Sequence, residues 1–364
     1  MRINLNRANM SINYRLTPLT QKITSMKFKI NPAFYLILCA IFVSPTLASE
    51  ELNVYSARKE AYIKPLLDQF SQAHNVQVNL VTSKADALIQ RLIGEGENTP
   101  ADVLITVDAG RLYRAQQAGL LRSIDGSQFT QAAPSQFQDP QGYWFGLSLR
   151  ARTIVYHPQR VQASELSDYA SLADPQWKQR ICIRSSNNIY NQSLVASMIA
   201  HDGVEKTQHW ANHFVGNFAR KPQGGDRDQI KAVAAGQCDI AVVNSYYLGS
   251  MLIGSDAEKA AASSVKLFWP NQQERGVHMN ISGIAVTQHA KNSQLAIQLI
   301  EFLYTDEAQA WYGDVNMEYP VRKGITTNPT LLSWGDYQAD DLALTELGIH
   351  NSEAVKVMDK AGWK

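Results

Sequence analysis

The sequence predicts an α/β protein of two lobes with a mostly helical C-terminal tail. Segments with strand and helix patterns alternate from residue 52 to residue 119. The alternation resumes after a turn-rich stretch at residues 125–142. In addition, a predicted leader of 48 residues leaves 316 of the 364 residues for the mature chain. A chain of 316 residues is longer than one hydrophobic core usually accommodates.

The first 48 residues have the plan of a secretory signal peptide. Lys27 and Lys29 precede an apolar run at residues 34–43 (FYLILCAIFV), and small residues follow up to Ala48. The competing interpretation is a membrane anchor, but a spanning helix needs about 20 apolar residues, roughly twice this run. We therefore expect cleavage near Ala48, export to an oxidising compartment and no stable membrane insertion; Met26 is an alternative start.

The charge balance argues against nucleic acid as a partner. The full chain has 34 basic and 33 acidic side chains, and the leader holds six of the basic residues and no acidic ones. The remaining 28 basic and 33 acidic residues give the mature chain a net charge of −5. A mildly acidic protein without a basic cluster does not match the phosphate backbone of nucleic acid.

The first part of the mature chain predicts parallel βαβ units. Residues 60–74 (EAYIKPLLDQFSQAH) repeat apolar side chains at helical spacing, whereas residues 76–81 (VQVNLV) alternate as in a strand. Strands are expected at residues 52–55, 76–81 and 102–107, and helices at 60–74, 85–95 and 109–119. Short connections between such elements favour a sheet with helices on both faces.

The second part continues the alternation and ends in helices. Strands are expected at residues 147–156, 180–183, 240–243 and 277–287, and a loop begins at Asn244. Helices are expected at residues 193–201, 207–214, 229–235, 294–304, 306–312, 340–347 and 352–361.

Common catalytic motifs are missing from the sequence. It contains no G-x-S-x-G, no H-E-x-x-H, no phosphate loop with its lysine and no G-x-G-x-x-G after a strand. We therefore expect a protein that is not an enzyme. An exported α/β hydrolase stays open as an alternative, which would need a nucleophile and a base.

Two cysteines of the mature chain precede similar tyrosine-containing segments. Cys182 lies eight residues before Tyr190, and Cys238 lies eight residues before Tyr246, each at or near a predicted strand. If the two strands are neighbours, a disulfide would join the bases of two tyrosine-bearing segments. The alternative is a pair of reduced, buried thiols.

The tyrosines need a special setting to act as ligands. Tyr246 and Tyr247 would point to opposite faces of a strand, so they converge only if the chain turns, which Asn244 and Ser245 favour. On composition alone, Tyr190, Tyr246 and Tyr247 are ordinary core and rim aromatics. Because a phenol has a pKa near 10, three of them bind an ion at neutral pH only if its charge favours phenolates.

Fe³⁺ is an ion with the required charge. It is hard, selects anionic oxygen donors and displaces phenolic protons. Three phenolates balance its charge and leave coordination positions for a bidentate anion such as carbonate or bicarbonate. Arg58 follows the first strand, at the sheet edge where open α/β folds bind ligands, and its guanidinium suits an oxyanion. The helix start after residues 185–188 offers free N–H groups, at Ser186 and Asn187, as weaker anion contacts.

Five segments resemble those of bacterial periplasmic ferric-ion-binding proteins, the substrate-binding components of iron(III) ABC importers. They are residues 54–58 (VYSAR), 100–104 (PADVL), 184–191 (RSSNNIYN), 220–228 (RKPQGGDRD) and 244–247 (NSYY). The resemblance covers essentially the whole mature chain. It implies a type II periplasmic-binding-protein fold, with residues 49–149 and 281–364 in lobe 1, residues 150–280 in lobe 2, and crossing strands between the lobes.

The resemblance also implies the site, the location and the partners. By position, the Fe³⁺ ligands would be Tyr190, Tyr246 and Tyr247, with Arg58 on a synergistic carbonate or bicarbonate. The protein would be a periplasmic monomer that delivers iron to an inner-membrane ABC permease with its ATPase. A two-lobed binder of another small solute or oxyanion, with the tyrosines as stacking surfaces, is the alternative.

The sequence departs from the family in one segment. Some members have a His, or His-Tyr, where this chain has Lys59 and Glu60. That departure favours the subgroup with three tyrosines and an anion, and leaves Glu60 and Tyr62 as weaker ligand candidates. Arg111 is a further candidate for an anion contact, and its alternative interpretation is a surface helix charge.

Overall fold

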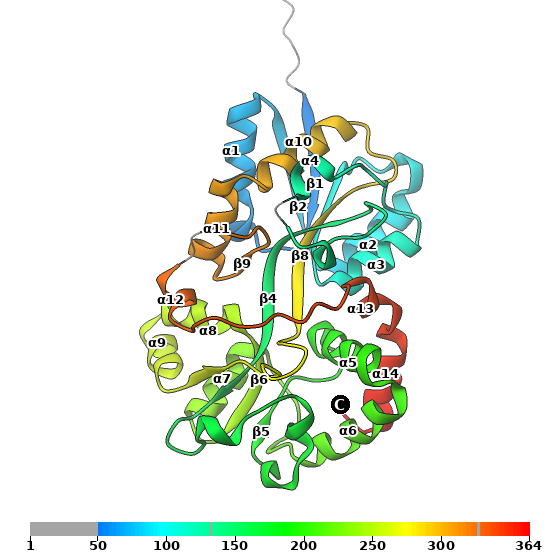
Figure 1. Cartoon of the computed structure of the whole chain (residues 1–364). Coiled ribbons are helices and arrows are strands. Elements are labelled where there is room, and N and C mark those ends of the chain that lie inside the picture. Colours follow the sequence, from blue (N-terminus) through cyan, green and yellow to red (C-terminus); the bar gives the residue numbers. More distant parts are fainter. Residues whose placement is uncertain (1–49, 132, 326–327) are drawn as a thin grey trace, which may run out of the picture. The chain divides into compact units, whose positions relative to one another are not determined.

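The computed structural model describes residues 50–131, 133–325 and 328–364, and the predicted signal peptide lies outside them. A sheet runs in the order β2-β1-β3-β8-β4-β6-β5, and β7 and β9 also pair with β4. β1 is parallel to β2 and β3, and β5 is parallel to β6, whereas β4 is antiparallel to β8 and β6 (Figure 1). The predicted parallel βαβ units are therefore present.

The elements follow one another in an order close to the expected one. The N-terminal part contains β1 (Glu51–Ser56), α1 (Lys64–His74), β2 (Gln77–Thr82), α2 (Ala85–Glu95), β3 (Val103–Val107), α3 (Ala109–Gln117), α4 (Ser127–Thr130) and β4 (Phe145–Tyr156). The middle contains β5 (Ile181–Cys182), α5 (Ile189–Asp202), α6 (Val204–Gly216), α7 (Asp226–Ala234), β6 (Ile240–Asn244), α8 (Ser245–Leu252), α9 (Asp256–Ser263) and β7 (Lys266–Phe268). The C-terminal part contains β8 (Met279–Val286), α10 (Ser293–Leu303), α11 (Asp306–Asn316), β9 (Tyr319–Pro320), α12 (Pro329–Leu332), α13 (Thr345–Ile349) and α14 (Asn351–Lys360).

The strand β4 links the two halves of the sheet. Its first part pairs with β8, from Phe145 opposite Ile284 to Ala151 opposite Met279, and its last part, Arg152 to Tyr156, pairs with β6. All twelve residues of β4 are buried. Figure 1 shows β4 and β8 side by side between the two groups of helices.

The buried apolar side chains form three clusters. The first cluster joins β1, β3 and β8 to α1, α2, α3 and α10. The second joins the end of β4 to α5, α6 and α14, and the third joins β6 to α7, α8 and α9. We call the elements around the first cluster the first lobe, and those around the other two the second lobe.

The predicted lobe boundaries, 49–149 plus 281–364 against 150–280, stay a proposal. The packing of α14 favours one change to them. Ala354, Val357, Met358 and Trp363 lie in the second cluster, so residues 351–363 group with the second lobe instead of the first.

Two expectations about secondary structure were wrong. The loop expected from Asn244 is the helix α8, whose first residue is Ser245. The helix expected at residues 340–347 begins only at Thr345, because the backbone N–H of Asp340 bonds the Val277 carbonyl and its carboxylate accepts from the Leu342 N–H. Those tertiary bonds hold this segment outside a helix.

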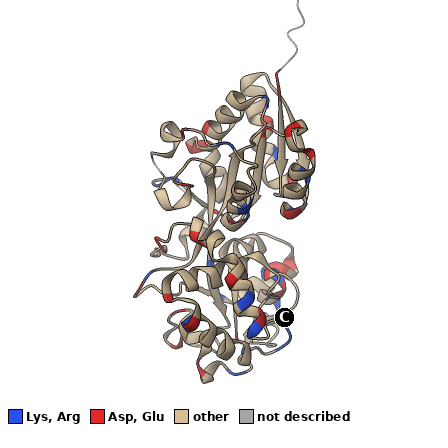
Figure 2. Cartoon of the chain, turned by 90° about the vertical axis from the view of Figure 1, so that its right-hand side faces the viewer, with Lys and Arg blue, Asp and Glu red and all other residues tan. Residues whose placement is uncertain are grey.

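Among the described residues, no helix combines the length and apolarity needed to span a bilayer. Figure 2 shows basic and acidic residues interspersed over the helices, without a continuous basic stretch in that view.

Candidate functional site

The three predicted tyrosines line one cavity of about 200 Å³. Its walls come from the ends of β1 and β3, the strand β4, the starts of α5, α7 and α8, and the segment before β9. The lining residues are Ala57, Arg58, Lys59, Tyr62, Val107, Arg150, Tyr190, Arg227, Tyr246, Tyr247 and Glu318. Phenols from the second lobe and cations from the first lobe therefore face the same space.

Helix starts present the tyrosines to this cavity. Tyr190 is the second residue of α5, and Tyr246 and Tyr247 are the second and third residues of α8. In a helix, consecutive side chains are about 100° apart, so neighbouring tyrosines can face one space, unlike those of a strand. The ring centres of Tyr246 and Tyr247 lie 4.1 Å apart. The chain turn that the convergence of Tyr246 and Tyr247 requires is therefore the start of α8.

The two tyrosine-bearing segments begin from adjacent, covalently linked strands. Cys182 in β5 lies opposite Ala241 in β6, and its sulfur is bonded to that of Cys238, with the Cα atoms 5.8 Å apart. The disulfide ties the strand before Tyr190 to the turn before β6. Cross-linking residues 56 positions apart in sequence restricts the unfolded chain and so stabilises this region.

A buried ion cluster forms another part of the cavity wall. Glu318 accepts from Arg58 Nη1 at 3.0 Å and from Arg150 Nη2 at 3.1 Å, and all three side chains are at most 4% exposed. Ser282 Oγ contacts both guanidinium groups, and Ser148 Oγ donates to Glu318. Two cations share one carboxylate, so this wall keeps one excess positive charge.

Arg150 also reaches the tyrosines. Its Nη1 donates to Tyr190 Oη at 3.4 Å, and its guanidinium carbon lies 5.2 Å from the ring centre of Tyr246. Within the described residues, the Nε atoms of Arg150 and Arg58 are buried without a hydrogen-bond partner. Donors that lack partners in a charged cavity favour an anionic ligand.

Burial and charge shift the acidities of these groups. Burial, followed by Tyr190, raises the pKa of both Tyr246 and Tyr247 well above that of a free phenol. Burial alone would raise the pKa of Glu318, but Arg150 and then Arg58 hold it below the ordinary value. At neutral pH without a metal, the two phenols are protonated and Glu318 is charged.

The remaining predicted residues divide into two groups. Arg58 and Tyr62 line the cavity, whereas Glu60, Ser186, Asn187 and Arg111 do not belong to its lining. Arg111 instead bonds the carboxylate of Asp86 at 3.1 Å. The cavity thus brings together the three tyrosines with Arg58, and leaves the weaker anion candidates elsewhere.

Among the lining residues that the sequence did not predict for the site, three besides Lys59 are charged: Arg150, Arg227 and Glu318. Arg150 had a signal, because it and Arg152 are charged residues two positions apart in a strand that is otherwise mostly apolar. Arg227 belongs to the GGDRD segment, which resembles the family sequence but has no pattern of its own that indicates a ligand. Glu318 had no local signal, since the two arginines that it binds, Arg58 and Arg150, lie 260 and 168 residues away in the sequence.

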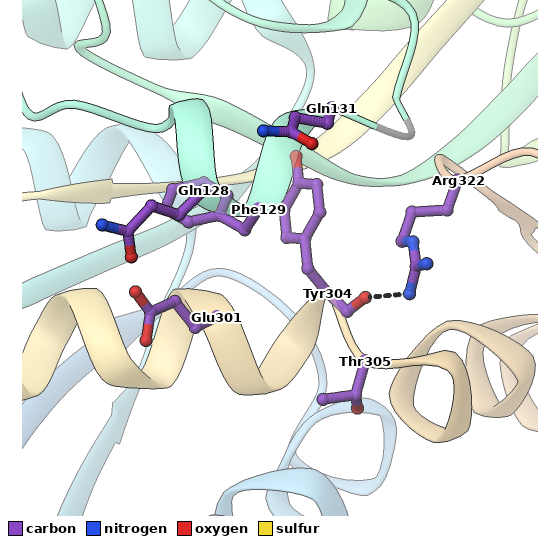
Figure 3. Close-up of a pocket in the computed structure, with 7 residues that line it drawn as sticks. All are labelled: Gln128, Phe129, Gln131, Glu301, Tyr304, Thr305 and Arg322. Atoms are coloured by element: carbon purple, nitrogen blue, oxygen red, sulfur yellow. Dashed lines mark hydrogen bonds between the residues drawn. The ribbon is translucent and has the colours of Figure 1, made fainter.

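A second cavity, of about 470 Å³, lies in the first lobe and has a different chemistry (Figure 3). It is lined by Gln128, Phe129, Gln131, Glu301, Tyr304, Thr305 and Arg322. Its single phenol, on Tyr304, donates to the Gly146 carbonyl, and Arg322 Nη1 donates to the Tyr304 carbonyl at 2.7 Å. This cavity has one carboxylate, on Glu301, and one phenol, which is already hydrogen-bonded, so the tyrosine-lined cavity is the stronger candidate for the functional site.

Comparisons with known proteins agree on the family. Residues 66–340 match the family described as bacterial extracellular solute-binding protein. The chain is 45% identical to iron uptake protein A1 of Synechocystis sp. over 86% of this chain and 88% of that protein.

Solved structures give the same result. The Trichodesmium protein IdiA (FutA), in complex with iron and citrate ligands, is 46% identical over 86% of this chain and all (100%) of that chain, with a TM-score of 0.84. The ferric binding protein from Campylobacter jejuni is 35% identical over 86% of this chain and 100% of that chain, with a TM-score of 0.82. The fold is therefore the type II periplasmic-binding-protein fold, in a binding protein and not an enzyme. The chain belongs to the bacterial extracellular solute-binding proteins, in the family of periplasmic ferric-ion-binding proteins.

Proposed function

We propose that the protein binds Fe³⁺ as cargo in the tyrosine-lined cavity and delivers it to an inner-membrane ABC permease with its ATPase. Tyr190, Tyr246 and Tyr247 bind the ion as phenolates, and Arg58 holds a carbonate or bicarbonate that completes the coordination. The protein acts in the periplasm after removal of the signal peptide, as a monomer. The observation that carries this proposal is the convergence of three phenols on one cavity with a cationic wall.

The formal charges of the cavity favour a trivalent ion together with an anion. Arg227 is balanced by Glu258, at 2.8 Å, and the Arg58–Glu318–Arg150 cluster contributes one positive charge. Lys59 adds another. Three phenolates cancel Fe³⁺, so the two remaining positive charges match a dianion such as carbonate. With Fe²⁺ and the same dianion, the site would carry one uncompensated negative charge.

Two further observations support an anion beside the iron. The Nε atom of Arg58 is buried without a partner among the described residues, so it can donate to an oxyanion. The Trichodesmium relative holds iron and citrate. Fe³⁺ prefers more than three ligands, and a bidentate anion would occupy positions that three phenolates leave open.

The two-lobed fold suggests how the cargo is taken up and released. The second lobe supplies the phenolates, and the first lobe supplies Arg58 and Lys59. Closure of the lobes would bring the two sets together, and the permease would release the iron by separating them. Arg150, on the strand that links the lobes, contacts the groups on either side of the cavity.

The test is a titration of the metal-free protein with ferric iron in bicarbonate buffer. We expect one iron per chain and a visible phenolate-to-iron charge-transfer band, bleached by excess citrate or by acid. Iron binding without this band would contradict the tyrosine ligands. No iron binding would contradict the whole proposal.

The cationic wall also fits an oxyanion bound without metal, which is the alternative function. The same titration with phosphate or sulfate in place of iron distinguishes the two. Micromolar binding of such an anion to protein that does not bind iron would favour the oxyanion function.

A further inference from the structure

A second buried ion cluster lies behind the tyrosines, around Asp226. Asp226 is the first residue of α7, within the GGDRD segment, and its side chain is completely buried (0% exposed). Gly224 makes the turn before it: its φ is 69°, and a Cβ there would lie 2.6 Å from Asp228 Oδ2. The turn brings the carboxylate of Asp226 into the interior of the second lobe.

Both oxygens of this carboxylate are used. Oδ1 accepts from Arg152 Nη1 at 2.6 Å and from the backbone N–H of Asn244 at 3.2 Å. Oδ2 accepts from Arg184 Nη1 at 2.7 Å. One carboxylate therefore binds three groups that come from three different segments.

Arg184 and Arg152 lead to the first tyrosine. The guanidinium carbon of Arg184 lies 5.8 Å from the ring centre of Tyr190. Arg152 Nη2 donates at 2.6 Å to the side-chain oxygen of Asn191, the residue after Tyr190. The amide of Asn191 in turn donates to the Arg184 carbonyl at 3.0 Å. These bonds fix the start of α5 relative to the carboxylate.

Asn244 leads to the other two tyrosines. It is the last residue of β6 and directly precedes the helix that begins at Ser245 and carries Tyr246 and Tyr247. Its N–H bonds Asp226, and its side-chain oxygen accepts from Arg152 Nη1 at 3.1 Å. The same carboxylate thus fixes the start of α8.

We propose that Asp226 is a positioning residue that sets the placement of Tyr190 relative to Tyr246 and Tyr247 by holding the starts of α5 and α8 together. This inference rests on the proposed iron-binding function. Every group that bonds the carboxylate comes from the second lobe or from the part of β4 paired with β6. The ligand set is therefore pre-organised before the first lobe closes on it.

Replacement of Asp226 by Asn separates a positioning role from a purely electrostatic one. Removing a negative charge beside the site destabilises Fe³⁺ but stabilises the three phenolates that balance it, so a purely electrostatic role predicts little net change in iron affinity. Losing the double ion pair would leave Arg152 and Arg184 without their shared partner and loosen both helix starts. The positioning role therefore predicts weaker iron binding, whereas the purely electrostatic role predicts little change.

The experiment compares wild type, D226N and D228N in the full-length mature protein. Asp228 is exposed and accepts from the Gly225 N–H at 2.7 Å, so D228N removes the same charge two residues away without touching the arginines. We measure iron affinity by chelator competition, the release rate into excess citrate, and the charge-transfer band. Circular dichroism of the iron-free proteins reports folding.

We expect D226N to weaken iron binding by about 10- to 100-fold, the usual effect of removing an outer-shell partner, to speed release and to shift the band. D228N should behave as wild type. Unchanged or tighter binding by folded D226N would overturn the proposal, as would an equal loss in D228N. A wild type that binds no iron would instead refute the proposed function.

If D226N does not fold, R184K decides the question. Arg184 is 21% exposed at its side chain, and Lys keeps the charge but cannot reproduce the placement of the guanidinium. Weaker iron binding with a shifted band would support the positioning role. Binding and a band identical to wild type would overturn it.

Discussion

The two faces of the cavity differ in chemistry and in how they are built. The second-lobe face presents three tyrosines from two helix starts, held by a disulfide and by the Asp226 cluster. The first-lobe face presents Arg58 and Lys59, with Glu318 binding Arg58 to Arg150 of the linking strand. One face is suited to a metal cation and the other to an anion. Under the proposed function, we expect full iron affinity to require the anion as well as the metal, and both lobes.

Lowering the pH is the largest expected perturbation of the tyrosine face. Burial and then Tyr190 raise the pKa of both Tyr246 and Tyr247, so these phenols carry protons at neutral pH that iron must displace. Affinity should therefore fall as the pH falls, by up to about a thousandfold per pH unit if three protons are released. Chelator competition between about pH 6 and pH 8 measures this pH dependence of the iron affinity. An affinity independent of pH would exclude phenolate ligands.

Removing one phenol oxygen should have the next largest effect. We expect Tyr246→Phe or Tyr247→Phe to weaken iron binding by more than about 100-fold, since a lost ligand costs more than a lost outer-shell partner. The charge-transfer band should fall in parallel. Tyr143→Phe, outside the cavity, is the control, and Tyr62→Phe tests whether the first lobe adds a fourth phenolate. Full iron affinity in both Tyr246→Phe and Tyr247→Phe would contradict the assignment of these tyrosines as iron ligands.

The anion face should respond more weakly. Arg58→Gln removes one donor to the bound anion and should cost about tenfold in iron affinity, with less dependence on bicarbonate concentration. Arg111→Gln is the matched control, because Arg111 pairs with Asp86 and does not line the cavity. Similar losses in both variants would show that general charge, rather than a bound anion, explains the effect.

The disulfide should affect folding stability more than iron chemistry. Replacing Cys182 and Cys238 together by Ser should lower the free energy of unfolding by about 2–5 kcal/mol. Denaturant unfolding of the iron-free protein measures this change, with the wild type under reducing conditions as a second comparison. A double variant as stable as the oxidised wild type would mean that the link contributes nothing to the tyrosine face.

The convergence of the three tyrosines could largely be predicted from the sequence. Each cysteine lies eight residues before a tyrosine, and the neighbouring strands β5 and β6 bring the two passages together. The sequence missed that Tyr246 and Tyr247 begin a helix, because a short helix packed into a core has little periodic signal of its own.

The face that contains Arg58 and Glu318 could be predicted only in part. Arg58 could be located because it follows the first strand, but Glu318 meets Arg58 across 260 positions of sequence. Such a pairing is decided by the tertiary fold, and no local pattern encodes it. For the same reason the sequence did not reveal that Arg150 contacts Tyr190, or that Asp226 connects Arg152 to Arg184.

The most direct test is a crystal structure of the iron-loaded protein with anomalous scattering recorded at the iron absorption edge. We predict one strong peak in the tyrosine-lined cavity, within bonding distance of the phenol oxygens of Tyr190, Tyr246 and Tyr247, with a small anion between the iron and Arg58. An iron peak elsewhere, or one that these oxygens do not reach, would contradict the account.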